Sequence, residues 1–414
     1  MNKLKYAILM LLISTSVYSQ NVKITDFDLP VSSARKFTLN GFYNWGQTDP
    51  YDSTAALSNS SSWNLGGQFT TFYSSPAYAW NVAVDGSLFQ LNRGDTTRYR
   101  YNLAADMSKY FNNTHGFFAN GEVNSSFYRQ SEFGTSNADT VIPGTPNRPT
   151  IEVFGGLGYG RRVNATSIAK AIRIDEDLKK AGINKKFMPK STMLAIAKII
   201  DRESEYRDKY KALYESKIIE DINKEIIASG VSNYTSMSAL GFMRIRDVLY
   251  GTNQFLNERA WGGDIRVGVA YQLLTRNKLI DSPSPTMDIR GRYAYPIGLR
   301  HQILSFATIQ TPMDSNYFKL FLGKAGVSYS FNLTNRISFI AAYTMTLNQI
   351  FNRTTTTASG ITGTDKSAGN NSVLAGLNFY IENYVTLNIS AGYNNLWRNE
   401  ESFFTNASLG FIIF

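Results

Sequence analysis

The sequence predicts an all-β transmembrane antiparallel barrel of about 14 strands with an α-helical periplasmic insertion. Three observations predict it. Apolar and polar residues alternate with period two over most of the chain, the chain is mildly hydrophilic although it holds 25 Tyr and 26 Phe, and short and long connections alternate along it. In a membrane barrel only every second residue of a strand faces lipid, and aromatic girdles lie at both membrane interfaces. Together these properties favour a membrane barrel.

The N-terminus predicts a signal peptide and therefore export. Lys3 and Lys5 supply positive charge, residues 6–13 form an apolar run, and Val17 and Ser19 form a cleavage pair before Gln20. The run is too short for a membrane helix, which needs about 20 residues. The chain has no cysteine, which excludes a disulfide scaffold, thiolate metal sites and a lipoprotein anchor.

Fourteen segments show the alternation expected of strands with two different faces. In the clearest one, Ile265, Val267 and Val269 lie on one face, and Asp264 and Arg266 lie on the other. An even number of strands places both chain ends on one side, and the count holds to within two. The segments cover residues 35–46, 61–73, 77–90, 96–110, 115–130, 149–163, 260–275, 285–296, 299–312, 317–332, 335–350, 370–381, 384–396 and 402–414.

The connections predict an orientation. Every second connection is short, as periplasmic turns are, whereas the intervening ones are long and rich in Ser, Thr, Gly, Asn and Asp, as surface loops are. The N- and C-termini are therefore expected in the periplasm. The short connections are 74–76, 111–114, 296–298, 332–334 and 382–383, and the long ones include 47–60, 131–148 and 351–369.

One periplasmic connection, residues 164–259, is long and helical. Its spacing predicts helices over 166–181, over a long stretch from Pro189 to Gly230, and over 236–250. Residues 161–259 hold 19 Lys and Arg against 13 Asp and Glu. The two signs are interleaved, which indicates a solvated helical face and no nucleic-acid partner. The predicted organisation is a signal peptide over 1–19, strands 1–6 over 20–163, the insertion over 164–259 and strands 7–14 over 260–414.

Charged residues in the polar phase of the strands are predicted to line the lumen. Two interpretations remain open: the charges line an aqueous pore and set its ion preference, or they pair across the lumen and plug it. The lumen-lining set named by the pattern is Arg98, Arg100, Asp106, Glu122, Glu152, Asp264, Arg266, Asp288, Arg290 and Arg292, with Asp85 in the same phase.

No catalytic, cofactor or metal site is predicted. His115 and His301 are the only histidines, and no serine or acid partner is placed beside either by spacing. The glycines of the 154–162 run FGGLGYGRR lie inside an alternating strand, so we expect close packing in the lumen or a bend rather than a phosphate loop. The protein is therefore expected not to be an enzyme.

Two weaker signals concern the outer membrane. Asp52-Ser53-Thr54, Asp95-Thr96-Thr97 and Asp139-Thr140-Val141 resemble O-glycosylation sites of Bacteroidota. The terminal Phe414 resembles the signal that the outer-membrane insertion machinery reads, although the better apolar phase of the last strand leaves it on the opposite face.

Residues 158–182, GYGRRVNATSIAKAIRIDEDLKKAG, and the Tyr- and charge-rich helix after them resemble uncharacterised outer-membrane β-barrel proteins of the Bacteroidota type, which carry a helical mid-barrel insertion. The resemblance implies this architecture and a Gram-negative outer membrane. It implies no activity.

Two functions are compatible with the sequence. The first is a porin-like pore for ions or small solutes, with the helical insertion at its mouth. The alternative is a closed-lumen anchor or accessory subunit whose insertion, within 166–250, docks a periplasmic partner of an export or assembly machine. In both, the barrel contacts outer-membrane lipid and meets the insertion machinery during biogenesis.

Overall fold

The computed structural model describes residues 22–48, 58–90, 98–111, 115–129, 149–233, 238–251, 257–274, 284–315, 317–334, 336–357, 360–382, 385–396 and 400–411. The predicted signal peptide, the three Asp-Ser/Thr motifs and Phe414 lie outside the described residues.

In the described part of the chain, fourteen strands form one antiparallel sheet in which each strand pairs with its neighbours in sequence. The predicted fold class, an antiparallel barrel of 14 strands with a helical insertion, is confirmed. The strands are β1 (Ser32–Thr48), β2 (Ser58–Ser74), β3 (Tyr78–Gln90), β4 (Arg98–Tyr110), β5 (Phe117–Arg129), β6 (Thr150–Asn164), β7 (Ala260–Leu274), β8 (Thr286–Ile297), β9 (His301–Pro312), β10 (Leu320–Thr334), β11 (Ile337–Thr357), β12 (Gly360–Glu382), β13 (Val385–Leu396) and β14 (Glu400–Phe411).

The largest difference from the predicted strands concerns residues 351–369, which were expected to form a surface loop. There β11 continues to Thr357 and β12 begins at Gly360, so the two strands form one long hairpin with a bulge between Ile350 and Arg353. The antiparallel ladder resumes after the bulge, and the β-branched residues 354–357 favour a strand there.

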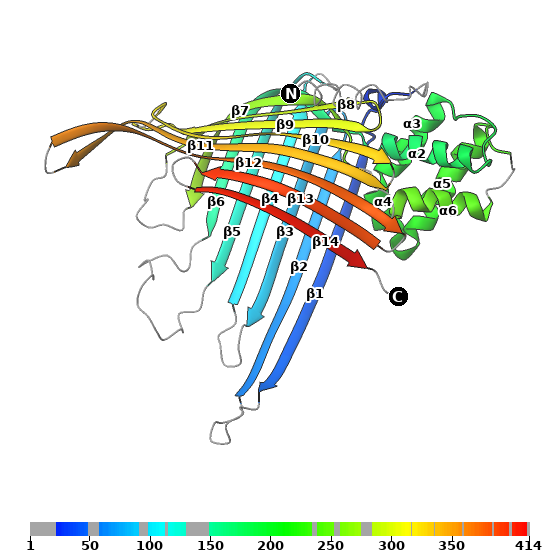
Figure 1. Ribbon diagram of the computed structural model, residues 1–414, viewed down its shortest axis with the longest axis horizontal. Coiled ribbons are helices and arrows are strands. Elements are labelled where there is room, and N and C mark those ends of the chain that lie inside the picture. Colours follow the sequence, from blue (N-terminus) through cyan, green and yellow to red (C-terminus); the bar gives the residue numbers. More distant parts are fainter. Residues whose placement is uncertain are drawn as a thin grey trace.

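The helices lie between β6 and β7 and gather at one end of the sheet (Figure 1). The stretch expected from Pro189 to Gly230 is divided. Arg202 ends the first helix, and Lys211, with a φ of 49°, ends the second. No helix in the described residues is long and apolar enough to cross a membrane. The helices are α2 (Thr166–Lys180), α3 (Lys190–Asp201), α4 (Glu203–Tyr210), α5 (Tyr214–Ala228) and α6 (Ala239–Tyr250), with short 3-10 turns η1 (Ile24–Asp26) and η2 (Lys211–Leu213).

The largest apolar core belongs to this helical insert and not to the sheet. Isoleucines dominate it, and Ile168, Ile196 and Ile222, from three different helices, are fully buried. The N-terminal segment completes the core, since Phe27 is fully buried and Ile24 nearly so. The insert is therefore a folded unit that includes residues from the start of the chain.

The two edge strands of the sheet remain separate. Among the described residues, β1 pairs only with β2 and β14 only with β13, while the sheet curls so that β11–β14 pass in front of β1–β5 in Figure 1. Helix α4 covers part of the β1 edge, because the Asp208 carboxylate accepts a hydrogen bond of 3.2 Å from the backbone N–H of Arg35. This contact satisfies a strand-edge donor that would otherwise be unpaired.

Candidate functional site: the charged inner face

The two faces of the sheet differ in chemistry and in burial. On β7, Val267 and Leu273 are 46% and 54% exposed, whereas Asp264, in the opposite phase, is 7% exposed. A curved sheet crowds the side chains on its concave face and spreads those on its convex face. The face that carries Asp264 is therefore the inner face, and the outer face carries apolar side chains that suit lipid contact.

Charged residues of the neighbouring strands β7 and β8 lie side by side on the inner face. Asp264 stands opposite Arg292 in the register, and Arg292 donates to both of its carboxylate oxygens, from Nε at 3.2 Å and from Nη2 at 2.9 Å. This two-pronged geometry is the strongest form of an arginine–carboxylate contact.

The most deeply buried acid of the inner face is Asp288, which is fully buried. Its carboxylate accepts from Arg290 Nε at 2.8 Å and Nη2 at 2.6 Å, and from Gln310 Nε2 of β9 at 2.8 Å. A buried carboxylate needs such compensation, because an unpaired one would cost several kcal/mol.

Glu122 of β5 links this cluster to the other side of β6. It forms ion pairs with Arg266 and with Arg290, the latter at 3.2 Å. The ring of Phe154 on β6 lies beneath both guanidinium groups, with ring-to-cation distances of 5.5 and 5.2 Å. The ring thus supports the two arginines while the carboxylate neutralises them.

The glycines of the 154–162 run make room for this arrangement. A Cβ on Gly156 would meet the Phe154 ring at 2.9 Å, and a Cβ on Gly158 would meet the Phe118 ring at 2.3 Å. Gly160 has a φ of +95° near the end of β6. The run therefore allows close packing on the inner face, which is one of the two alternatives expected from the sequence.

Four of the ten predicted charges therefore form one network over β5–β8, Glu122, Arg266, Asp288 and Arg290, and Asp264 and Arg292 form a separate pair beside it. The other four lie on the same face without joining it. Arg100 donates to Ser87 Oγ at 2.9 Å, Asp106 accepts from Asn81 at 3.4 Å, and Glu152 is exposed. Arg98 stands opposite Phe89 in the β3–β4 register.

The two histidines form aromatic contacts. His301 is buried, shares a hydrogen bond of 2.6 Å with the Tyr329 hydroxyl, and stacks on Phe331. His115 packs against Trp261 with the two rings tilted and their centroids 4.8 Å apart. No group of three or more metal-ligating side chains occurs in the described ranges.

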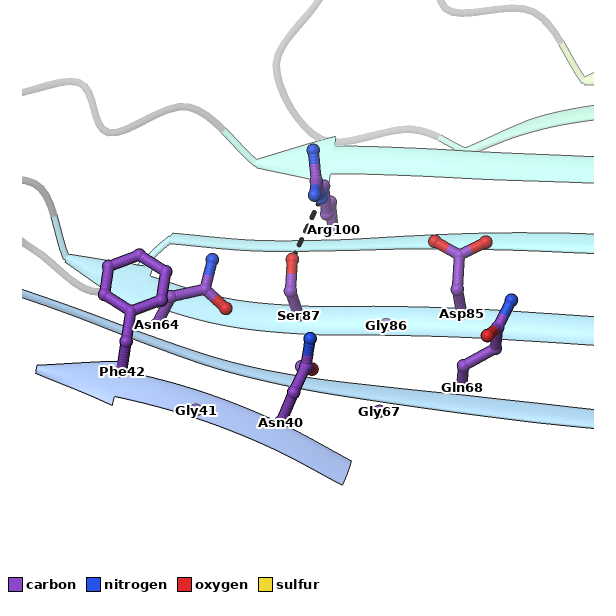
Figure 2. Close-up of a pocket in the computed structure, with 11 residues that line it drawn as sticks. Asn40, Gly41, Phe42, Asn64, Gly67, Gln68, Asp85, Gly86, Ser87 and Arg100 are labelled. Atoms are coloured by element: carbon purple, nitrogen blue, oxygen red, sulfur yellow. Dashed lines mark hydrogen bonds between the residues drawn. The ribbon is translucent and has the colours of Figure 1, made fainter. Parts of the chain in front are cut away.

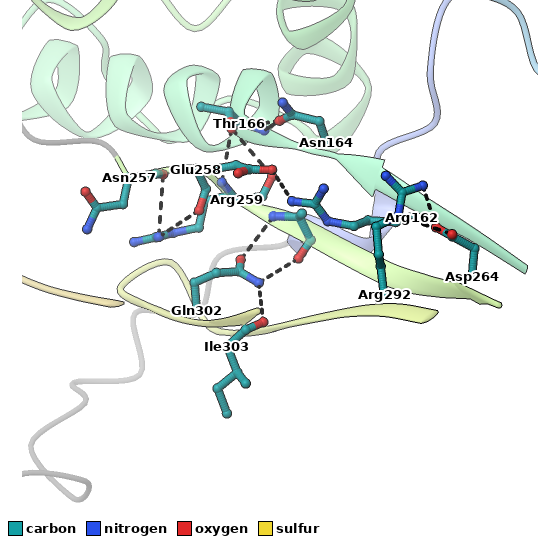
Figure 3. Close-up of polar contacts among 11 residues, drawn as sticks. Arg162, Asn164, Thr166, Asn257, Glu258, Arg259, Asp264, Arg292, Gln302 and Ile303 are labelled. Atoms are coloured by element: carbon teal, nitrogen blue, oxygen red, sulfur yellow. Dashed lines mark hydrogen bonds and ion pairs between the residues drawn. The ribbon is translucent and has the colours of Figure 1, made fainter. Parts of the chain in front are cut away.

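A second polar cluster, which sequence reasoning missed, fixes the insert to the sheet (Figure 3). Arg259 is fully buried and donates to the backbone carbonyls of Leu299 at 3.1 Å and Arg300 at 3.2 Å. Burial lowers the pKa of its guanidinium to about 10. The Gln302 side chain holds Ala260, the residue after Arg259, in place. It accepts a hydrogen bond from the Ala260 N–H and donates one to the Ala260 carbonyl, both at 3.0 Å.

The N-terminal segment adds a third attachment at this end. Asp26 pairs with Lys190 of α3 at 2.9 Å, and the Trp261 indole donates to the Phe27 carbonyl at 3.3 Å. The hydrogen bond from the backbone N–H of Lys23 is the main cause that lowers the pKa of the Asp26 carboxyl, and the positive charge of Lys190 lowers it further. The start of the chain, the insert and β7 are thus joined at one end of the barrel.

Comparison with solved structures returns membrane channels at very low similarity. A mutant of the TodX monoaromatic hydrocarbon channel is 8% identical, with a TM-score of 0.24 over 92% of this chain and 80% of that one. A mutant of the Rh. blastica porin is also 8% identical, with a TM-score of 0.22 over 91% and 99%. No protein-family model matches the sequence, and no curated protein matches it. At these scores the likeness does not extend to function.

Proposed function

We propose that the protein is a channel for ions or small solutes in the outer membrane of a Gram-negative bacterium. Its apolar outer face contacts lipid, and its polar inner face surrounds water. The helical insert lies on the periplasmic side with both termini, because the short turns and the insert share one end of the sheet. Short turns at that end are typical of periplasmic connections.

The observation that carries the proposal is the direction of the inner-face ion pairs. Each pair among the described residues lies within one strand or joins strands no more than three apart along the wall: Asp288 with Arg290 within β8, Asp264 with Arg292 on adjacent strands, and Glu122 of β5 with Arg266 of β7 and Arg290 of β8. Charges that plug a lumen would reach across it. Pairs that lie flat on the wall satisfy the charges and leave space for water.

Planar-bilayer recording of the purified mature protein tests the proposal. The folded barrel is expected to give discrete conductance steps with weak ion preference, because the predicted inner set contains five arginines and five acids. Arg292 is the most exposed arginine of the inner-face ion pairs among the described residues, with 53% of its side chain exposed. Arg292→Gln should shift the reversal potential in a KCl gradient toward the K⁺ equilibrium value, because it leaves Asp264 without its cation.

The matched control is Arg246→Gln, which removes the same charge from an exposed position on α6, outside the barrel. It should leave the reversal potential unchanged. Silent bilayers from protein that gives the circular dichroism spectrum of a folded barrel would refute the channel. Equal shifts in the two variants would refute the role of the inner face.

One observation favours the second function, docking of a periplasmic partner. Helix α6 exposes Leu240 (47%), Phe242 (40%) and Met243 (59%) on the folded insert. Under this function, deletion of 166–250 leaves an inserted barrel but abolishes co-purification of a partner, and Met243→Asp does the same without deletion. Wild-type protein that purifies alone under gentle conditions would refute it.

A further inference from the structure

The inner face of β1–β4 contains a shallow hollow of about 300 Å³, on strands that carry none of the ion pairs of β5–β8 (Figure 2). Its lining is mostly uncharged and polar, with one aromatic ring, one acid and one arginine. The lining residues are Asn40, Gly41, Phe42, Asn64, Gly66, Gly67, Gln68, Asp85, Gly86, Ser87 and Arg100.

Gly66 allows the polar lining of the hollow to pack closely over the sheet. One register row across the four strands reads Asn40, Gly66, Ser87 and Arg100. A Cβ on Gly66 would lie 2.6 Å from Asn40 Oδ1, so the Asn40 amide extends over the space that a side chain would fill. Gly67, the next residue, faces the other side, and its Cβ would meet nothing nearer than 3.8 Å.

The charged groups at the border are held in place by neighbours. Arg100 uses Nε to donate to Ser87 Oγ at 2.9 Å, and the terminal nitrogens of its guanidinium take no part in that bond. Asp85 Oδ2 accepts from Asn102 Nδ2 at 2.9 Å. Fixed side chains lose little freedom when they bind a ligand, which favours recognition.

We propose that this hollow binds a neutral saccharide in the channel. A sugar hydroxyl both donates and accepts, so a ring of hydroxyls matches the mixture of amides, carboxylate and guanidinium around Gly66. Phe42, which is 56% exposed, offers a ring face on which the C–H side of a sugar packs. Asp85 and Arg100 oppose each other's charge, which disfavours a charged solute, and the polar lining disfavours an apolar one.

The proposal rests on the channel function, because solutes reach the inner face through the lumen. It also narrows that function to uncharged, hydroxyl-rich solutes. The volume is small for a ligand pocket, which indicates a mono- or disaccharide, so maltose is a suitable probe.

Calorimetric titration of maltose into the folded protein tests the site directly. The detergent must lack a sugar headgroup, for example a dimethylamine oxide, since a maltoside would compete. Gly66→Val puts its side chain where the Asn40 amide now lies, so that the amide must move, and valine suits a strand. We therefore expect at least about a tenfold rise in Kd. Gly121→Val, on the outer face of β5 and outside the lining, is the matched control and should leave Kd within about twofold of wild type.

A second pair of variants tests the polar border without adding bulk. Arg100→Gln should raise Kd about five- to tenfold through loss of a charged hydrogen-bond donor. Arg98→Gln, on the same strand and face but outside the lining, should not raise it. If Gly66→Val does not fold, Arg100→Gln still tests the binding site.

The outcomes separate the site from the channel. Conductance steps that maltose interrupts in wild type and Gly121→Val, but not in Gly66→Val, support both the site and the channel. Silent bilayers together with calorimetric binding sensitive to Gly66→Val support the site and refute the channel. No binding to folded wild type, or equal weakening by the two valine variants, refutes the site whatever the conductance.

Discussion

The carboxylate of Asp175 should make the stability of the insert depend on pH in an unusual direction. It lies in α2 at 2% exposure and accepts a hydrogen bond of 3.0 Å from the backbone N–H of Met188. Burial is the largest cause that raises its pKa to about 6, above the ordinary 3.8. That difference corresponds to about 3 kcal/mol of cost for the ionised form in the folded state.

The sign follows from proton binding. Between about pH 4 and pH 6 the folded state keeps the proton of Asp175 while the unfolded chain releases it, so the free energy of unfolding falls as the pH rises through this window. Asp175→Asn carries no charge and keeps an acceptor for Met188. At pH 7.4 we expect it to stabilise the insert by about 2 kcal/mol, since its new N–H groups are partly uncompensated.

Urea titration of the full chain in micelles, followed by helical ellipticity at 222 nm, measures this effect. Wild type should have a lower midpoint at pH 7.4 than at pH 5, and Asp175→Asn should lose most of that difference. Asp177→Asn, two residues along the same helix and partly exposed, is the control and should keep it. A pH difference that persists unchanged in Asp175→Asn would refute the reasoning.

Two further predictions concern buried charges. Arg259→Met leaves the carbonyls of Leu299 and Arg300 without their buried donor; the free energy of unfolding of the insert should fall by about 3 kcal/mol, seen as a lower urea midpoint at 222 nm. Asp288→Ala leaves Arg290 without its main partner and should cost the barrel about 3 to 5 kcal/mol, measured by urea unfolding in lipid vesicles. The exposed Asp106→Ala is the control; a drop there as large as for Asp288→Ala would contradict the role of burial.

The sequence predicted the strands and the face of each charged residue because both depend only on period two. A wrong loop length does not change which residues share a face within one strand. The alternation alone therefore predicted that Asp264 and Arg266 lie on the same face as Arg290 and Arg292, without the strand register. The pairing of Glu122 with arginines two and three strands away needed the register and the space left by Gly156, which no local pattern reports.

Other features had weaker signals or none. The four threonines at 354–357 were a strand signal that the surrounding Gly, Ser and Asn residues obscured. Arg259 lies just before β7, next to residues without periodicity, so nothing marked it as buried. In the hollow of β1–β4, only Asp85 and Arg100 were singled out as inward-facing. Neutral residues such as Asn64 occur too often in strands to indicate a site.

The attachment of the helical insert has a consequence for how such a chain can change over evolution. The strand residues on either side of its helices, Asn164 at the end of β6 and Ala260 at the start of β7, are opposite each other in the β6–β7 register. Partners in an antiparallel pair have Cα atoms about 5 Å apart, the spacing that a tight hairpin closes. One in-frame insertion, deletion or exchange can therefore add, remove or replace the whole helical insert without shifting any strand. The strands of the barrel wall and the helical insert are thus free to evolve separately.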